Sequence, residues 1–367
     1  MAALKVDSMT PKLIAYGLSF LILVTCCPVF AQDGSGTSNQ GKFTLQWQRD
    51  ECKGCGDHFA LGPFQFMDSR VGWANAEFMP EKGNGTGSST VLHTTNGGRT
   101  WERLPFLDKY GNKISPVFWF LDEKRGWLSW VDESAVEHFE KTEDGGSTWS
   151  DLPALGTLDA IQFFGPDEGI FVTGGARAVF GRTQDGGRSW TKRQLPVGFA
   201  EGVWFLNSKV GWIFANDGRN TDDKRLGVLR TLDGGETWAW SLVGDFSSAN
   251  VQDFNWVNEK NGWLILLLAG DGGSGLFETQ DGGINWSKHA EDSFQGPGKY
   301  LTTVRFVNDA IGHMAYDDAR NGRHYLLDTQ DGGKTWDRRI LGKSISHCEV
   351  FHGEVWCSAG LDLLKIR

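Results

Sequence analysis

The sequence predicts an all-β protein built from many small sheets, and three observations carry that prediction. Glycine accounts for 49 of the 367 residues, nearly double its usual share of roughly 7%, which indicates many tight turns. Tryptophan is frequent, with 17 residues, and proline is scarce, with 10. The third observation is one turn motif that recurs at intervals of 41 to 50 residues. Repeats of this length, made of short strands, are typical of a β-propeller, in which four-stranded sheets called blades surround a central channel.

The turn motif follows the pattern Thr-x-Asp/Asn-Gly-Gly-x-Ser/Thr-Trp and occurs six times, with Asn285 in place of Ser/Thr in the fifth copy. The Asp or Asn side chain can accept backbone N–H bonds inside the turn, and glycine tolerates positive φ. Each closing tryptophan is expected to bury its ring between neighbouring sheets. We therefore interpret these residues as structural. They are Asn96, Asp144, Asp185, Asp233, Asp281 and Asp331 in the turns, and Trp101, Trp149, Trp190, Trp238, Trp286 and Trp336 at their ends.

A second motif, the strand motif, alternates with the first. It consists of an apolar strand ending near an aromatic residue, a polar turn closed by glycine, and a second strand that opens on an aromatic residue. Its copies are Phe66–Trp73, Phe120–Trp127, Phe164–Phe171, Phe205–Trp212, Trp256–Trp263 and Phe306–His313, with a degenerate copy at Phe351–Trp356. The two motifs together predict six blades, at residues 58–107, 112–153, 157–196, 199–244, 249–291 and 299–341.

The seventh blade is predicted to be shared between the two ends of the chain. The stretch 345–367 supplies only three strands and has no turn motif. The missing strand is available at 43–49, where Trp47 occupies the position of the tryptophan that closes the turn motif. Residues 43–367 are therefore expected to form a single seven-bladed propeller. Joining the two ends in one blade closes the ring, whereas an open ring would leave edge strands unpaired.

The turn motif resembles the Asp-box (BNR) repeat over nearly the whole mature chain. The double glycine and the interleaved strand motif look most like the photosystem II assembly factor family of Ycf48-like propellers. This resemblance implies a propeller fold, with the boxes on hairpins away from the ligand-binding face. It also implies a role in assembling photosystem II, with a reaction-centre subunit as the partner. Many bacterial proteins share the pattern, so it does not by itself imply photosynthesis.

The first 31 residues have the pattern of a secretory signal peptide. Lys5 and Lys12 precede an apolar stretch at 13–24, and small residues precede Gln32, which predicts cleavage after Ala31. Residues 32–42 then form a flexible leader. The protein is expected to be exported to the periplasm or secreted. Two alternatives keep it at the membrane: an uncleaved segment 13–31 that spans the bilayer, or a lipoprotein.

Four cysteines remain after the predicted cleavage, in an oxidising compartment. Cys348 and Cys357 are symmetric about a two-residue hairpin turn, so we expect them to form a disulfide. Cys52 and Cys55 have the CxxC spacing, but no thioredoxin-like βαβ pattern surrounds them. A small structural disulfide is favoured there over a redox or metal site.

Four polar residues lie within the apolar strands that are expected to line the channel: Asp159, Glu201, Asp253 and Arg305. They are the candidate binding residues, and the alternative is that they merely solvate the channel. The segment 217–223 has a passing likeness to a calcium loop but lacks the distal glutamate of an EF-hand. We predict no metal site and no cofactor.

The net charge of −10 argues against nucleic-acid binding and against adhesion to anionic lipid. A sialidase would need three arginines around the substrate carboxylate, and Arg305 is the lone arginine on a predicted inner strand. Other Asp-box glycosidases use two channel carboxylates, for which Glu201 and Asp253 are candidates. The favoured prediction is a monomeric, non-catalytic exported propeller that binds another protein. A secreted glycoside hydrolase and a surface adhesin are the alternatives.

Overall fold

The computed structural model describes residues 45–49, 51–53, 59–78, 88–104, 116–132, 134–174, 177–217, 225–244, 249–268, 273–289, 294–360 and 362–366. All the regular secondary structure in these ranges is β-strand, and every strand belongs to the unit formed by residues 34–367. The predicted signal peptide and leader lie outside the described residues. Within the described part of the chain, no helix is long and apolar enough to cross a membrane.

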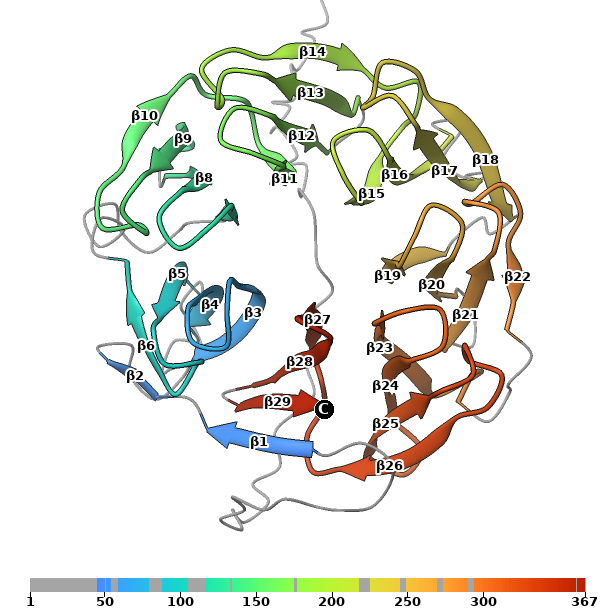
Figure 1. The fold of residues 1–367 in the computed structure, drawn as a ribbon. Helices are drawn as coiled ribbons and strands as arrows, with labels where there is room; N and C mark the ends of the chain where they lie inside the picture. Colours follow the sequence, from blue (N-terminus) through green and yellow to red (C-terminus); the bar gives the residue numbers. More distant parts are fainter. Residues whose placement is uncertain are drawn as a thin grey trace, which may run out of the picture. The chain divides into compact units, whose positions relative to one another are not determined.

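Seven sheets surround a central axis, so the fold is the predicted seven-bladed β-propeller (Figure 1). In each of blades 2 to 6 the first strand lies innermost and the last strand outermost. Blade 1 contains β3 (Phe59–Phe66), β4 (Gly72–Phe78), β5 (Ser88–Thr94) and β6 (Thr100–Arg103); blade 2 contains β7 (Val117–Phe120), β8 (Gly126–Val131), β9 (Glu137–Thr142) and β10 (Ser150–Leu152). Blade 3 contains β11 (Leu158–Phe163), β12 (Gly169–Thr173), β13 (Val179–Thr183) and β14 (Thr191–Gln194); blade 4 contains β15 (Ala200–Phe205), β16 (Gly211–Asn216), β17 (Leu226–Thr231) and β18 (Ala239–Gly244). Blade 5 contains β19 (Asn250–Trp256), β20 (Gly262–Leu267), β21 (Ser274–Thr279) and β22 (Ser287–Lys288); blade 6 contains β23 (Lys299–Phe306), β24 (Gly312–Asp318), β25 (Arg323–Thr329) and β26 (Asp337–Leu341).

Blade 7 closes the ring in the predicted way. Its strands β27 (His347–Phe351), β28 (Glu354–Ala359) and β29 (Asp362–Ile366) are completed by β1 (Leu45–Arg49), which pairs antiparallel with β29. A further strand was not predicted: β2 (Glu51–Lys53) runs parallel to β6 and makes blade 1 five-stranded. The segment after β1 therefore continues from the outer edge of blade 7 to the outer edge of blade 1.

Flat stacking of aromatic rings joins consecutive blades. The tryptophan that follows glycine in the strand motif stacks on the aromatic residue that ends the inner strand of the next blade. Ring centroids lie 3.5–3.9 Å apart in four such pairs: Trp73–Phe120, Trp127–Phe163, Trp212–Trp256 and Trp263–Phe306. Three of these indoles also donate a hydrogen bond to a glycine carbonyl in the turn motif of the next blade. Each stacked pair buries apolar area, and in these three pairs the hydrogen bond also satisfies a buried donor, which stabilises the blade interface.

The strand motif of blade 3 begins one residue earlier than the sequence pattern suggested. Phe163, and not Phe164, pairs with Gly169, just as Phe120 pairs with Gly126 in blade 2. The reason is steric, because a Cβ on Gly169 would lie 2.6 Å from the Phe163 ring. Ile170 therefore stands where blades 1, 2, 4 and 5 have tryptophan, and blade 6 has His313 at this position. The blade 3–4 interface lacks the stacked indole, and Phe180 instead lies nearly parallel to Phe205, with ring centroids 6.0 Å apart.

The tryptophans of the turn motif are less buried than expected. Trp101 is fully buried, whereas Trp149, Trp190, Trp238, Trp286 and Trp336 are half-buried. Each of these five immediately precedes the outermost strand of its blade. Their rings meet the inner aromatic residue of the same blade edge-on, as Trp149 meets Phe120 at 80°. Trp101 differs because β2 runs beside its strand, with Cys52 opposite Trp101 in the register.

Candidate functional site

The acidic turn motifs are self-contained hydrogen-bonded turns. In blade 2, Asp144 Oδ1 accepts from the Thr148 backbone N–H at 2.8 Å and its Oδ2 accepts from the Thr148 hydroxyl at 2.6 Å. The glycines that follow have φ of 77° and 97°, as predicted for this turn. Hydrogen bonds from the following Ser or Thr lower the pKa to about 2 in three copies, at Asp185, Asp233 and Asp331. These carboxylates are ionised acceptors for their own turn, which is unsuited to proton transfer near neutral pH.

The turn motif and the strand-motif turn of each blade lie at the same end of the sheet. The first glycine of the turn motif donates its N–H to a carbonyl of the strand-motif turn, as Gly145 does to Lys124 at 2.8 Å. The same bond occurs in all six blades that carry the turn motif. The inner strands end at these turns and therefore begin at the opposite end of the sheet. The channel mouth at that opposite end is formed by residues outside the two motifs.

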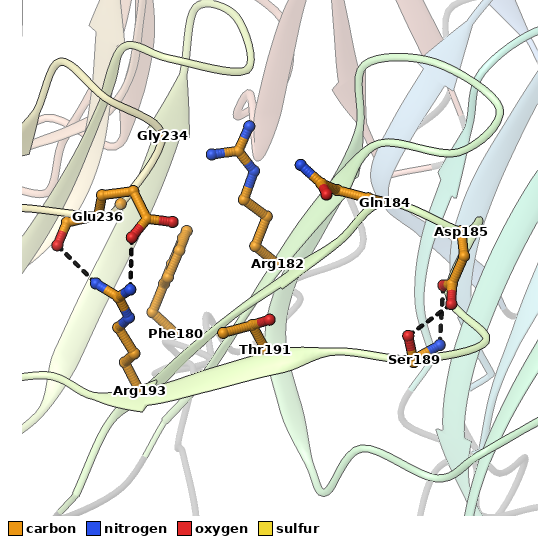
Figure 2. A pocket seen from close by; sticks show the side chains of 10 residues that line it. Phe180, Arg182, Gln184, Asp185, Ser189, Thr191, Arg193, Gly234 and Glu236 are labelled. Atoms are coloured by element: carbon orange, nitrogen blue, oxygen red, sulfur yellow. Dashed lines mark hydrogen bonds and ion pairs between the residues drawn. The ribbon is translucent and has the colours of Figure 1, made fainter.

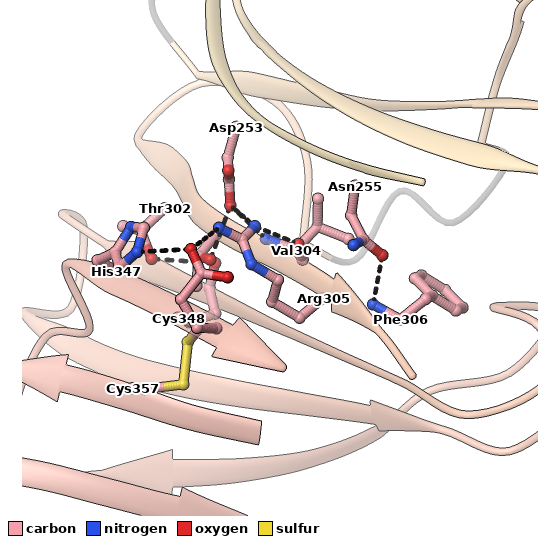
Figure 3. A network of polar contacts seen from close by, with 12 residues as sticks. Asp253, Asn255, Thr302, Val304, Arg305, Phe306, His347, Cys348 and Cys357 are labelled. Carbon is pink, nitrogen blue, oxygen red and sulfur yellow. Dashed lines mark hydrogen bonds and ion pairs between the residues drawn. A yellow bond between two sulfur atoms is a disulfide. The ribbon is translucent and has the colours of Figure 1, made fainter. Parts of the chain in front are cut away.

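Two of the four candidate binding residues meet in a buried ion pair (Figure 3). Arg305 of β23 is only 4% exposed, and its Nη1 donates to Asp253 Oδ2 at 2.6 Å and to the Val304 carbonyl at 2.7 Å. The same Asp253 oxygen accepts from the Thr303 hydroxyl at 2.7 Å and the Val304 N–H at 2.9 Å. Arg305 therefore does not project into open solvent as expected. It ties the inner strands of blades 5 and 6 together.

A third inner strand completes this network. Glu349 of β27 places Oε1 3.7 Å from Arg305 Nη2 and 2.9 Å from His347 Nε2. Burial disfavours charge on both groups, but the carboxylates of Asp253 and Glu349 raise the pKa of Arg305, and Arg305 in turn lowers the pKa of Glu349. We call Asp253, Arg305, Glu349 and His347 the channel-wall network. Sequence reasoning missed Glu349 and His347, although both lie in the first strand of the predicted last blade.

Asp159 and Glu201 occupy equivalent positions, each at a β-bulge near the start of an inner strand. Asp159 is exposed to solvent as a residue. The protein atoms around its carboxyl group nevertheless desolvate the carboxylate, and this raises its pKa to about 6. A Cβ on Gly174 would lie 2.0 Å from that carboxylate, so the glycine makes room for it. Glu201 is half-buried and its Oε2 accepts from the Val251 N–H of blade 5 at 3.1 Å. Glu201 thus connects blades 4 and 5. Asp159 is the candidate binding residue whose carboxyl pKa is raised towards neutral pH.

Blade 7 also contains the disulfide between Cys348 and Cys357. The two residues are directly opposite in the β27–β28 register, with Cα atoms 4.0 Å apart. The hairpin between them has positive φ at His352 (46°) and Gly353 (79°), as a two-residue type I′ turn requires. Cys55 and the side chain of Cys52 lie outside the described residues.

A polar pocket of about 240 Å³ opens between blades 3 and 4, where Ile170 replaces the stacking tryptophan (Figure 2). Arg193 of blade 3 donates to the carbonyl and the carboxylate of Glu236 in blade 4 across this pocket. Arg182, which also lines it, is paired with Glu168 at 2.6 Å. Both cations are thus neutralised by carboxylates of the chain itself. Among the residues that the structure describes, no group of three or more His, Cys, Asp or Glu could hold a metal ion.

Solved structures with this fold include proteins of different roles. A structure described as YCF48 bound to D1 peptide is similar over 90% of this chain and 96% of its own, with a TM-score of 0.62 and 17% identity. YCF48 from Cyanidioschyzon merolae is similar over 88% of this chain and 98% of its own, with a TM-score of 0.61 and 18% identity. The GH74 xyloglucanase from Xanthomonas campestris is similar over 86% of this chain and 52% of its own, with a TM-score of 0.57 and 14% identity. No protein-family model and no curated protein matches the sequence. Likeness at these identities establishes the propeller fold and leaves the role to be argued from the site.

Proposed function

We propose that this chain is a non-catalytic, exported propeller that binds another protein at the mouth of the channel where the inner strands begin. A monomeric scaffold of this kind needs a rigid ring, and the stacked blade interfaces and shared blade 7 supply one. The partner proposed from the family resemblance is a photosystem II reaction-centre subunit. The likeness of fold to a propeller described as bound to D1 peptide supports that choice of partner.

The observation that carries the proposal is the state of Asp253. Hydrolysis by two channel carboxylates would require one to act as an acid and the other as a base or nucleophile. The bonded Oδ2 of Asp253 accepts hydrogen bonds from three groups of blade 6, and Glu201 is bonded to the backbone of blade 5. Both carboxylates nominated for catalysis therefore hold neighbouring blades together.

A labelled D1 peptide tests this proposal directly. We expect fluorescence anisotropy to show saturable binding to the wild-type protein. Asp159→Lys, at the proposed mouth, should weaken it at least tenfold. Glu123→Lys makes the same charge change on an exposed strand-motif turn at the other end of blade 2 and is the control. Absence of binding would remove the reaction-centre partner, and equal binding by both variants would remove the proposed mouth.

A glycoside hydrolase is the rival function, and Asp159 is the residue that favours it. A carboxyl group with its pKa raised to about 6 can serve as a general acid. Purified protein should be assayed with xyloglucan and fluorogenic sialosides. Sustained turnover that is abolished in Asp159→Asn would contradict the non-catalytic proposal.

A further inference from the structure

The outermost strand of blade 4 differs from every other outermost strand of the propeller. Charged side chains on an exposed edge strand hinder its pairing with other chains. Six of the seven outermost strands carry at least one charged residue, whereas β18, Ala239–Gly244, carries none. The charged residues of the others include Arg49 in β1, Lys53 in β2, Asp151 in β10, Lys192 in β14, Lys288 in β22 and Asp337 in β26.

The uncharged strand also exposes two large apolar side chains. Trp240 and Leu242 are 38% and 37% exposed, and they alternate along β18, so they lie on one face of the strand. Trp240 lies over Gly227 of the neighbouring strand, where a Cβ would meet the indole ring at 2.2 Å. The missing side chain at Gly227 therefore allows the ring to lie against the sheet beside an open backbone edge.

The protein already shows that the edge of a blade accepts an added strand. In blade 1 the segment Glu51–Lys53 pairs with β6 as a fifth strand. None of the described strands pairs with the outer edge of β18, whose partner on the inner side is β17. The backbone groups on that outer edge are available for the same kind of pairing.

We propose that the outer edge of β18 binds an extended segment of a partner protein as a fifth strand of blade 4. Backbone hydrogen bonds to β18 would hold the segment, and its apolar side chains at alternate positions would pack on Trp240 and Leu242. This surface lies on the rim of the ring, so the inference goes beyond the proposed function at the channel mouth.

A second copy of this chain is a poorer occupant of the edge. A six-residue strand spans only about 20 Å, and two half-exposed side chains add little to the ~1,200 Å² that a stable protein interface buries. Two copies that each carry a net charge of −10 also repel one another. A flexible segment avoids these costs because it needs only the edge itself.

The test uses the full chain and a labelled nine-residue peptide in which valine and threonine alternate between terminal lysines. We expect saturable binding of this probe and protection of β18 amides from hydrogen exchange. The same peptide with every backbone nitrogen methylated can donate no backbone hydrogen bond to β18 from either edge and should not bind. Leu242→Lys should weaken binding at least tenfold. The matched control is Ile340→Lys, on the charged strand β26, where Ile340 is 61% exposed; it should bind as the wild type does.

Three results would overturn the inference. The first is no protection of β18 amides at saturating probe, and the second is equal binding by Leu242→Lys and the wild type. The third is a wild-type dimer in sedimentation analysis that Leu242→Lys converts to a monomer, because the edge would then hold a second copy. Leu242 is partly exposed, so the variant should keep the wild-type melting temperature. If the melting temperature of Leu242→Lys falls, the milder variant Leu242→Thr is used in its place. The probe should then protect the β18 amides of Leu242→Thr from hydrogen exchange less than those of the wild type, and equal protection would overturn the inference. None of these results depends on binding of the D1 peptide at the channel mouth.

Discussion

Replacing Arg305 by methionine is the sharpest test of the channel-wall network. The substitution keeps a long apolar stem but removes the guanidinium between Asp253 and Glu349. Those carboxylates are 16% and 35% exposed, so both remain largely desolvated when their cation is lost. Removing one partner of a buried ion pair costs about 3–5 kcal/mol.

The structure places the expected loss at the lower end of that range. Asp253 keeps the Thr303 hydroxyl and the Val304 N–H, and Glu349 keeps His347. We therefore expect Arg305→Met to lower the free energy of unfolding by about 3 kcal/mol. For a domain of this size the melting temperature should fall by about 4 °C. Urea unfolding followed by tryptophan fluorescence measures the first quantity, and calorimetry measures the second.

The matched control is Arg193→Met, which breaks an exposed Arg–Glu pair between blades 3 and 4. The side chains of Arg193 and Glu236 are 48% and 54% exposed. Solvent screens such a pair, so the loss should stay below about 1 kcal/mol. Equal losses in the two variants, or an Arg305→Met protein as stable as the wild type, would refute the claim that burial makes the network important.

Four further outcomes follow from the same contacts. The pKa of Glu349 is lowered in the folded protein, so the ionised carboxylate contributes fully to stability above the ordinary pKa of 4.5, and this contribution is lost as pH falls through the lowered pKa. The difference in unfolding free energy between wild type and Arg305→Met should therefore become smaller in acid. A difference that does not change with pH would contradict this. Deleting residues 43–50 removes β1 and should destabilise the whole ring in calorimetry, whereas unchanged cooperative melting would count against closure by blade 7. Replacing both Cys348 and Cys357 by serine removes a disulfide of sequence separation 9 and should lower the free energy of unfolding in urea by about 2.5 kcal/mol. An unchanged free energy of unfolding under oxidising conditions would argue against the disulfide. Gly126→Ala would place a Cβ 2.5 Å from the Phe120 ring and should cost about 1–3 kcal/mol, and a neutral effect would show that the ring can move aside.

The blades could be predicted from sequence because both motifs encode local chemistry. Consecutive glycines at positive φ and an acidic acceptor define the turn motif wherever they occur. In the strand motif, glycine is required by the ring it faces, as Gly126 faces Phe120. The same logic explains the error in blade 3. Phe163 and Phe164 are adjacent, so the pattern alone fits two frames, and only the contact with Gly169 separates them.

The channel-wall network could not be predicted as a unit because it depends on contacts between blades. Sequence indicated Asp253 and Arg305 as polar residues in apolar strands, but not that three consecutive inner strands would bring Asp253, Arg305 and Glu349 together. Glu349 lies in the seventh blade, whose motif is degenerate, so no repeated pattern drew attention to it. Strand β2 was missed for a related reason. Three residues are too few to show a period of two, and parallel pairing with β6 leaves no hairpin signal.

Departures from the repeat are the most informative features of this molecule. Where blades obey the repeat, each residue has a local structural reason, so the repeated carboxylates and tryptophans need no ligand to explain them. Two departures from the repeat lie close together, one at the interface between blades 3 and 4 and one on the outer edge of blade 4. Ile170 replaces the stacking tryptophan at their interface, where a pocket opens, and β18 lacks the charge that every other outermost strand carries. Neither departure adds stability to the ring, since one removes a stacked indole and the other leaves apolar area in water. A rim surface that is costly to the fold and absent from the other blades is best explained by binding, which is why β18 and not the acidic turns is the place to look for a second partner.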